Sequence, residues 1–392
     1  MEQRRIQPIL GEDILQKLYV ESSTLCNLAC TMCMRNTWKD EQMGHLDFDL
    51  YKKVIQEAAN IPTIHTVFFG GVGEPTFHPR FTEMVALAKA AGKRVECVTN
   101  GTLLNKEYIT QLITAGLDMA WVSVDGLDEM QYESIRKNGH YATVYENLLT
   151  MKDLRETALG KDFEVGLSFV AMRENIGQLG RLMSFAWEVK ANDVKITNLL
   201  PYTEESAAQS LIWQPFNNRS FLERNPADSL GGQPIHAHVD FPVMTLDEDT
   251  IGPIANMLRR PNTFSLMGDP IRRKTGYCKF VQEGNAFLRW DGEICPCMGL
   301  LHNTEAYIYK MDGFTRQIKE KSYGNVAENT LMEIWQGEDY TAFRQRVLDF
   351  SFSYCYLCGG CHRVLSNEED CFQNQHPCCG ACLWAQGFVQ CP

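Results

Sequence analysis

Short β-rich segments alternate with stretches of helical period along the first half of the chain. In the helical stretches the apolar residues fall on one face, as in the series Phe48, Tyr51, Val54, Ile55 and Ala58. This alternation is typical of βα units around a parallel sheet. Six such units predict an α/β fold with an open, partial barrel. The six expected strands are Tyr19–Glu21, Thr66–Phe69, Val95–Thr99, Met119–Val124, Glu164–Val170 and Val194–Leu199.

Polar motifs follow the expected strands at the point where each one ends. A cysteine-bearing loop follows the first strand, and GGVGEP (70–75) follows the second. TNGT (99–102) closes the third strand and SVDG (123–126) closes the fourth. Because chemistry in parallel α/β proteins gathers at the carboxyl ends of the strands, we expect these motifs to line a single cavity.

The pattern changes after the sixth strand, which suggests three parts. Residues 1–203 carry the βα units, and residues 204–274 lose that regularity apart from one amphipathic stretch, Asp249–Leu258. We interpret this middle part as a linker or insertion. Residues 275–392 are rich in cysteine, and they contain AFLRWDGEICPC, which predicts two short strands around an Asp291-Gly292 turn.

Composition and charge narrow the class of protein. The chain of 392 residues is 44% hydrophobic and 22% charged, as soluble globular proteins are. Its 37 basic and 49 acidic residues give a net charge of −12, which disfavours a protein that holds nucleic acid by its phosphates. We find no secretory signal and no apolar run long enough to span a bilayer, so we expect no membrane association and a cytoplasmic location.

Fifteen cysteines in a long chain of this kind favour metal binding over disulfides. Three of them lie close together as Cys26-x3-Cys30-x2-Cys33. Three thiolates on one loop can hold three irons of a [4Fe-4S] cluster and leave the fourth iron open for a small chelating molecule. A structural zinc site with a distant fourth ligand is the alternative, although CxxC pairs are its usual signature.

The three-cysteine motif, followed by GGVGEP and an SVDG strand end, resembles the radical S-adenosylmethionine (SAM) superfamily. The resemblance implies a partial (β/α)6 TIM-like barrel in which the open iron chelates SAM, and reductive cleavage then gives a 5′-deoxyadenosyl radical. One departure is Met32, where the family often has an aromatic residue before the third cysteine. The positions that the resemblance assigns to SAM binding are Gly70, Gly71, Gly73, Glu74, Asn100, Ser123 and Arg136.

The cysteine-rich end resembles the SPASM extension that follows many radical SAM barrels and holds auxiliary [4Fe-4S] clusters. Cys278, Gly292 and Cys297 have the spacing of its opening, whereas the later cysteines depart from the usual spacing. We expect one or two auxiliary clusters, and we interpret Cys295 and Cys378 as surplus neighbours. The candidate ligands are Cys278, Cys297, Cys355, Cys358, Cys361, Cys371, Cys379, Cys382 and Cys391.

The closing string DCFQNQHPCCGACLWAQGFVQCP, together with RWDGEICPC and FFGGVGEPTFHPRF, resembles the radical SAM maturases associated with tungsten-containing aldehyde ferredoxin oxidoreductases. That resemblance implies maturation of the tungstopterin cofactor or of its enzyme. We expect a reduced ferredoxin or flavodoxin to supply the electron for SAM cleavage. Two alternatives stay open. One is a maturase of a ribosomally made peptide or an enzyme side chain, and the other is an iron–sulfur electron carrier or assembly scaffold in which SAM plays no part.

Overall fold

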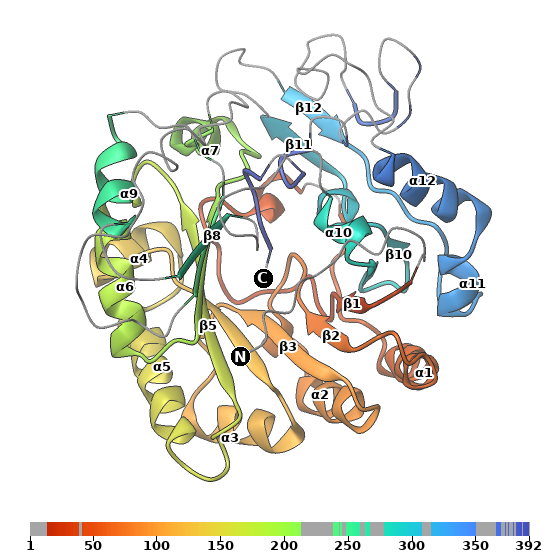
Figure 1. The fold of residues 1–392 in the computed structure, drawn as a ribbon, viewed down its shortest axis with the longest axis horizontal. Coiled ribbons are helices and arrows are strands. Elements are labelled where there is room, and N and C mark those ends of the chain that lie inside the picture. Colours follow the sequence, from red (N-terminus) through yellow and green to blue (C-terminus); the bar gives the residue numbers. More distant parts are fainter. Residues whose placement is uncertain are drawn as a thin grey trace.

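A curved sheet forms the centre of the molecule, and helices cover its outer face (Figure 1). The structure is a computed structural model. It describes residues 14–38, 41–212, 238–242, 244, 248–258, 263–266, 278–307, 315–349, 366–369, 373, 375, 379, 382–385 and 387–391.

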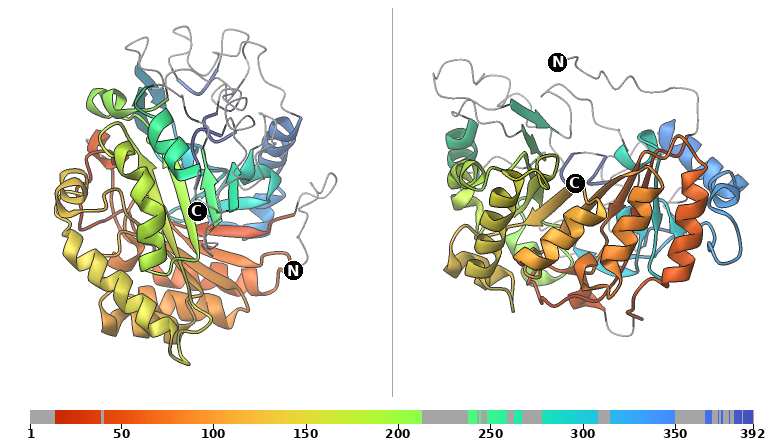
Figure 2. Two further views of the ribbon diagram at one scale, coloured as in Figure 1. Left: turned by 60° about the vertical axis from the view of Figure 1, so that its left-hand side comes forward. Right: turned by 90° about the horizontal axis from the view of Figure 1, so that it is seen from below.

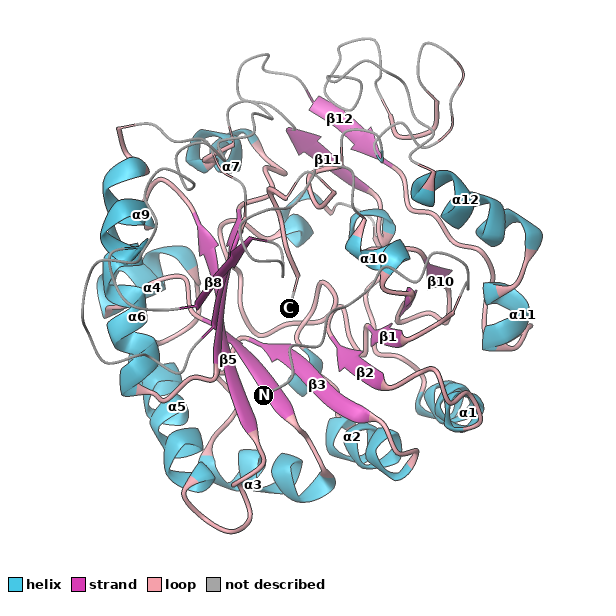
Figure 3. Ribbon diagram, viewed as in Figure 1, coloured by secondary structure: helices cyan, strands magenta, loops and turns pink. Residues whose placement is uncertain are grey.

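Ten strands make up this sheet, in the order β10-β9-β1-β2-β3-β4-β5-β6-β7-β8. Every neighbouring pair is parallel except β10 with β9. The terminal strands β10 and β8 do not pair, so the barrel is open (Figure 3). The strands are β1 (Lys17–Val20), β2 (Thr66–Phe69), β3 (Arg94–Thr99), β4 (Met119–Ser123), β5 (Glu164–Ala171), β6 (Asp193–Asn198), β7 (His238–Phe241), β8 (Thr263–Leu266), β9 (Asn285–Leu288) and β10 (Ile294–Cys295).

Helices connect the strands and pack on the convex side of the sheet, as the two views in Figure 2 also show. Helix α1 begins at a cap in which the Asp47 carboxylate accepts a hydrogen bond from the Leu50 N–H at 2.8 Å. The helices are α1 (Phe48–Ala59), α2 (Phe81–Ala90), α3 (Lys106–Ala115), α4 (Glu129–Ile135), α5 (Tyr141–Arg155), α6 (Leu179–Glu188), α7 (Glu204–Gln209), α9 (Ile251–Leu258), α10 (Lys279–Gln282), α11 (Leu331–Trp335) and α12 (Glu338–Leu348).

Much of the sheet is buried on both faces, and this explains why a strand such as β2, with the sequence TVFF, is a nearly continuous apolar run. The outer face packs against the apolar sides of the helices, as Tyr51, Val54 and Ile55 of α1 show. The inner face carries an aromatic layer in which Tyr19 stacks on Phe287 with 4.3 Å between ring centroids. The sheet is therefore packed by side chains on its outer face and on its inner face.

The predicted α/β fold with a partial barrel is confirmed. Each of the six expected strands is present, and its observed bounds differ from the predicted ones by no more than two residues. The turn predicted at Asp291-Gly292 is present as well, since β9 and β10 pair antiparallel around it and Gly292 has φ +90°. Both results follow from local pattern.

The sheet crosses the boundaries expected between the three parts of the chain. Strands β7 and β8 lie in the segment interpreted as a linker or insertion, and they extend the sheet in parallel beyond β6. Strand β9 lies in the cysteine-rich part, yet it pairs with β1. The linker interpretation missed β7 and β8 because HVDF and TFSL lack the nearly continuous apolar run that marks a strand such as β2. The division at 203 and 275 stays a prediction about sequence organisation.

A second, smaller sheet lies beside the barrel. It consists of β11 (Thr304–Tyr307) and β12 (Thr315–Ile318), which pair antiparallel. Helices α11 and α12 follow, and the end of α11 is buried at Trp335. In Figure 1 these elements lie near the β10 end of the barrel.

Candidate active site

The three-cysteine loop follows β1 and is anchored by its backbone. The Ala29 N–H donates to the Lys137 carbonyl at 3.0 Å, and the Thr31 N–H donates to the Ile135 carbonyl at 2.9 Å. These bonds dock the loop on the segment that ends α4. The three thiols that the loop presents are free and partly exposed, and they belong to Cys26, Cys30 and Cys33.

Asn100 fastens this loop to the end of β3. Its side-chain amide donates to the Asn27 oxygen at 2.9 Å and contacts the Cys26 sulfur at 3.7 Å. Its own oxygen accepts from the Thr102 hydroxyl at 2.6 Å, and the Asn27 amide donates to the same hydroxyl at 2.8 Å. Asn100 thus lies beside the first cysteine, where sequence analysis expected a SAM contact. Asn27 and Thr102 were missed as partners.

Burial and neighbouring groups disfavour ionisation of two of these thiols, Cys26 and Cys30. Burial raises the pKa of Cys30 to about 11, and the neighbouring thiols of Cys26 and Cys33 add to that rise, although the Arg136 guanidinium opposes it. Burial also raises the pKa of Cys26. Iron binding would supply the compensating positive charge, because a metal-bound thiol is deprotonated. Sulfur donors grouped on one loop fit a cluster.

Arg35 is a cation beside the thiols that sequence analysis missed. Its Nη2 donates to the Leu28 carbonyl at 2.6 Å. A hydrogen bond to the Cys33 thiol raises the pKa of Arg35, although burial acts in the opposite direction as the largest single effect. The positive charge of the Arg35 guanidinium therefore lies close to the sulfur of Cys33, the last cysteine of the motif.

The GGVGEP loop packs so closely against the start of the cysteine loop that it tolerates no side chain at Gly73. A Cβ there would lie 2.1 Å from the Ser23 carbonyl oxygen and 2.7 Å from that of Leu25. At Gly71 a Cβ would meet the Glu21 side chain at 2.5 Å, and at Gly70 it would meet the Phe68 ring at 2.8 Å. The three glycines bring backbone to the place where the resemblance expects SAM.

Glu74 is buried, and protein donors occupy both of its carboxylate oxygens. One oxygen accepts from the Thr76 hydroxyl at 2.6 Å, the Thr76 N–H at 3.1 Å and the Thr99 hydroxyl at 2.7 Å. The other accepts from the Asn100 N–H at 2.7 Å. Burial raises the pKa of Glu74 in spite of these bonds. In this structure the carboxylate joins the GGVGEP loop to the end of β3.

Arg136 forms a buried ion pair with Asp125, the acidic residue of SVDG, at 2.6 Å. Burial alone would lower the pKa of Arg136, but Asp125 and the nearby Cys30 hold it above its usual value. Asp125 also accepts from the Val170 N–H at 2.8 Å. Ser123 ends β4 beside Ser168 and is half-buried. The ion pair lies next to the second cysteine, and sequence analysis did not single out Asp125.

The structure describes five of the expected auxiliary ligands, and four others, Cys355, Cys358, Cys361 and Cys371, lie outside the described residues. Cys278 and Cys297 both pack against the aromatic layer inside the barrel. Cys379 and Cys297 lie near the Tyr323 phenol, where their charges add to the effect of burial in raising its pKa. Among the described residues no three Cys, His, Asp or Glu side chains form a single-ion site.

Cys382 and Cys391 belong to a C-terminal segment, here called the tail, whose described residues are 382–385 and 387–391. The tail binds to the end of β6. The Phe388 carbonyl accepts from the Asn198 amide at 2.7 Å, and the Gln390 N–H donates to the Thr197 hydroxyl at 2.9 Å. The Trp384 indole donates to the Cys391 sulfur at 3.3 Å. Thr197 and Asn198, which end β6, therefore bind this C-terminal segment.

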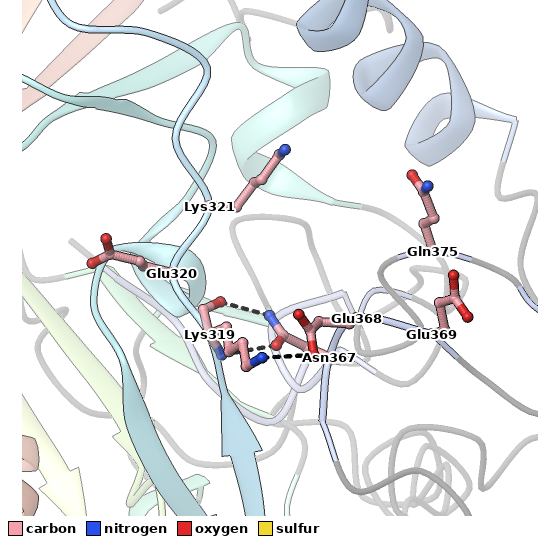
Figure 4. Close-up of a pocket in the computed structure, with 7 residues that line it drawn as sticks. All are labelled: Lys319, Glu320, Lys321, Asn367, Glu368, Glu369 and Gln375. Atoms are coloured by element: carbon pink, nitrogen blue, oxygen red, sulfur yellow. Dashed lines mark hydrogen bonds and ion pairs between the residues drawn. The ribbon is translucent and has the colours of Figure 1, made fainter.

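A surface pocket of about 290 Å³ lies at the end of β12 (Figure 4). The Asn367 side chain bonds to the Lys319 backbone in both directions, at 2.8 and 2.7 Å, and the Lys319 ammonium pairs with Glu368 at 2.8 Å. These contacts hold residues 366–369 against the strand. The seven lining residues offer ammonium, carboxylate and amide groups but no thiol.

Comparison with known proteins gives two domain matches. Residues 20–176 match the radical SAM superfamily, and residues 278–362 match the SPASM iron–sulfur cluster-binding domain. The first match contains the three-cysteine loop and the GGVGEP, TNGT and SVDG motifs. The second begins at Cys278 and covers β9 and β10.

One similar protein extends the likeness over nearly the whole chain, and another matches about half of it. The tungsten-containing aldehyde ferredoxin oxidoreductase cofactor-modifying protein of Pyrococcus furiosus is 29% identical over 96% of this chain and 97% of its own. The PqqA peptide cyclase of Bradyrhizobium diazoefficiens is 27% identical over 47% of this chain and 46% of its own. The crystal structure of anSMEcpe with bound AdoMet superposes with a TM-score of 0.61, at 16% identity over 95% and 92% of the two chains. The chain is a radical SAM enzyme with an SPASM iron–sulfur domain.

Proposed function

We propose that this radical SAM enzyme acts in the maturation of the tungstopterin cofactor or of the aldehyde ferredoxin oxidoreductase that carries it. The observation that carries the proposal is similarity over nearly the whole chain to the cofactor-modifying protein of Pyrococcus furiosus. Similarity to the peptide cyclase covers less than half of each protein.

In this proposal Cys26, Cys30 and Cys33 hold the [4Fe-4S] cluster that SAM joins. The loop is positioned in advance, because its backbone is bonded to residues 135 and 137 and its Asn27 to the end of β3. When bound, the cluster and SAM supply one-electron reductive cleavage. A reduced ferredoxin or flavodoxin is the proposed electron source.

None of the described helices has the length and apolarity that crossing a bilayer requires.

The SAM-binding edge would consist of Gly70, Gly71, Gly73 and Glu74 with Asn100, Ser123 and Arg136. The glycines have no side chain to keep a ligand away from their backbone, and Glu74 fixes the end of the loop through its bonds to Thr99 and Asn100. Arg136 is held in place by Asp125, which pairs with one nitrogen of its guanidinium group. We propose the remaining candidate cysteines as ligands of one or two auxiliary clusters.

The first test is anaerobic cleavage of SAM. The reconstituted protein is reduced with dithionite, SAM is added, and 5′-deoxyadenosine is quantified. We expect it from the wild type and not from a variant in which Cys26, Cys30 and Cys33 are all alanine. If neither protein forms it despite bound iron and intact folding, the electron-carrier alternative gains.

The second test separates the two maturase functions. Cleavage of SAM is measured with added tungstopterin-free aldehyde ferredoxin oxidoreductase, with tungstopterin, and with a short peptide. Stimulation by the oxidoreductase or the pterin, together with a mass change in that partner, is the expected result. Stimulation by a peptide alone would favour the peptide maturase, for which the half-chain similarity to the peptide cyclase is the supporting observation.

A further inference from the structure

A buried carboxylate at the end of β1 contacts two parts of the molecule that are distant in sequence. The Glu21 side chain is 1% exposed. Its Oε1 accepts from the Val72 N–H, inside GGVGEP, at 3.0 Å. Both of its oxygens lie 2.9 Å from Nε2 of His302, which is 5% exposed. One carboxylate therefore joins the GGVGEP loop to the segment that follows Cys297.

Gly71 allows this carboxylate to reach the loop. A Cβ at Gly71 would lie 2.5 Å from the Glu21 Cγ and 2.7 Å from its Oε1. The loop and the carboxylate thus fit each other closely. Because the Val72 N–H comes directly after Gly71, any movement of the carboxylate is transmitted to the middle of GGVGEP.

His302 extends the connection to the far end of the cysteine loop. Its ring lies against the Trp38 ring, with 4.9 Å between centroids. One residue earlier, the Thr37 hydroxyl bonds to the Thr304 hydroxyl at 3.1 Å. The histidine is therefore enclosed between the start of the GGVGEP loop and the residues that follow Cys33.

Loss of the imidazole would leave a buried carboxylate with one partner fewer. A buried polar group without its partner costs free energy, and the surrounding structure shifts to recover a donor. The main-chain donors near Glu21 are the Val72 N–H at 3.0 Å and the Trp290 N–H at 3.5 Å. Any shift of the carboxylate would therefore displace the loop.

We propose that Glu21 and His302 are a positioning pair which fixes the GGVGEP loop for SAM and makes SAM binding depend on the SPASM part of the chain. Neither residue is a catalytic residue in this proposal, because they act through the loop. The inference rests on the proposed function, which assigns the GGVGEP loop to SAM.

The test is the SAM dependence of 5′-deoxyadenosine formation in reconstituted full-length variants. For His302→Ala we expect the KM for SAM to rise about tenfold, as loss of a buried charged hydrogen bond implies. We expect kcat and iron content to stay near the wild-type values. His302→Gln, whose amide can donate to Glu21, is expected to restore most of the affinity. His140→Ala is the matched control, since the His140 side chain is 75% exposed.

Glu21→Gln gives a second result that does not depend on the stability of the alanine variant. It keeps the side-chain volume and one acceptor oxygen, so we expect a smaller rise in KM, about threefold. Unchanged KM in His302→Ala and Glu21→Gln would overturn the inference while the wild type still cleaves SAM. If the wild type neither binds nor cleaves SAM, the proposed function fails and the inference fails with it.

Discussion

The three-cysteine loop and the C-terminal segment both carry candidate cluster ligands, but the protein holds them in different ways. Several main-chain bonds to other main-chain groups hold the loop in addition to the side chain of Asn100, such as Thr24 to Gly44 at 3.0 Å and Thr31 to Ile135 at 2.9 Å. The C-terminal segment is held largely by side chains, chiefly those of Asn198 and Gln390.

The position of β7 explains this difference. Among the described residues β7 pairs with β6 only over Asp193–Lys195, and the described part of β7 does not pair with the last residues of β6. The C-terminal segment occupies this place, where the Gln390 amide donates to the Ile196 carbonyl at 2.7 Å. The comparison teaches that the barrel itself positions the loop, whereas the tail depends on a few specific side chains.

The largest expected effect is the loss of SAM cleavage when a cysteine of the three-cysteine loop is replaced. Cys30→Ala is predicted to reduce 5′-deoxyadenosine formation to the background rate, because it removes one of three proposed iron ligands. The matched control is Cys97→Ala, since Cys97 is fully buried in the core among apolar side chains. Retained cleavage in Cys30→Ala would sink the ligand assignment.

Removal of the tail is expected to have a smaller effect on SAM cleavage. A chain that ends before Cys379 should lose an auxiliary cluster, about four irons per protein, and still cleave SAM in part. Iron content and 5′-deoxyadenosine are measured on the same sample. Cys295→Ala serves as a control, because that buried thiol is proposed not to bind iron. Unchanged iron content after truncation contradicts the prediction.

Lys17, the first residue of β1, gives a pH-dependent prediction. Burial lowers the pKa of Lys17 from 10.5 to about 7. The charged form is thus disfavoured in the fold, so wild-type stability should rise as the pH increases from about 7 to 10.5. Lys17→Met should raise the free energy of unfolding at pH 6 by up to about 3 kcal/mol, and this gain should shrink towards pH 10.

Denaturant unfolding at both pH values checks the Lys17 prediction. Its control is Lys152→Met on α5, which lacks the contacts of Lys17 with the Tyr19 and Phe68 rings. An equal change in stability at pH 6 and pH 10 is the contrary outcome.

The smallest expected effect concerns the bond between Asn198 and the tail. Asn198→Ala should cost about 1–2 kcal/mol of local stability, since it removes the donor to the Phe388 carbonyl. Hydrogen exchange of residues 387–391 should become faster. Asn105→Ala, which removes the cap of α3, should cost a similar amount without changing exchange in the tail. Equal exchange rates in both variants would show that the tail is held by other contacts.

Sequence pattern predicts best where the information is local. The barrel strands follow from apolar runs of buried sheet, and the cysteine loop follows from spacing within eight residues. The Asp291-Gly292 hairpin follows from its turn residues. These features need no knowledge of distant contacts.

The features that sequence pattern did not predict are contacts between distant segments. Glu21 and His302 are both ordinary polar residues in sequence, and only the fold brings them within 2.9 Å of each other. The same holds for Arg136 with Asp125, and for the tail with β6. Glu21 does leave one signal, because a carboxylate directly after an apolar strand is at the edge where such sites gather.

The pairing of β1 with β9 has a consequence for how the protein is made. Lys17 lies beside Asn285, so the edge of the first strand stays open until most of the chain has left the ribosome. Pairing over so long a separation slows folding, and an unpaired edge strand invites aggregation. Slower synthesis at low temperature, with chaperones present, should therefore raise the yield of folded protein before any iron is supplied.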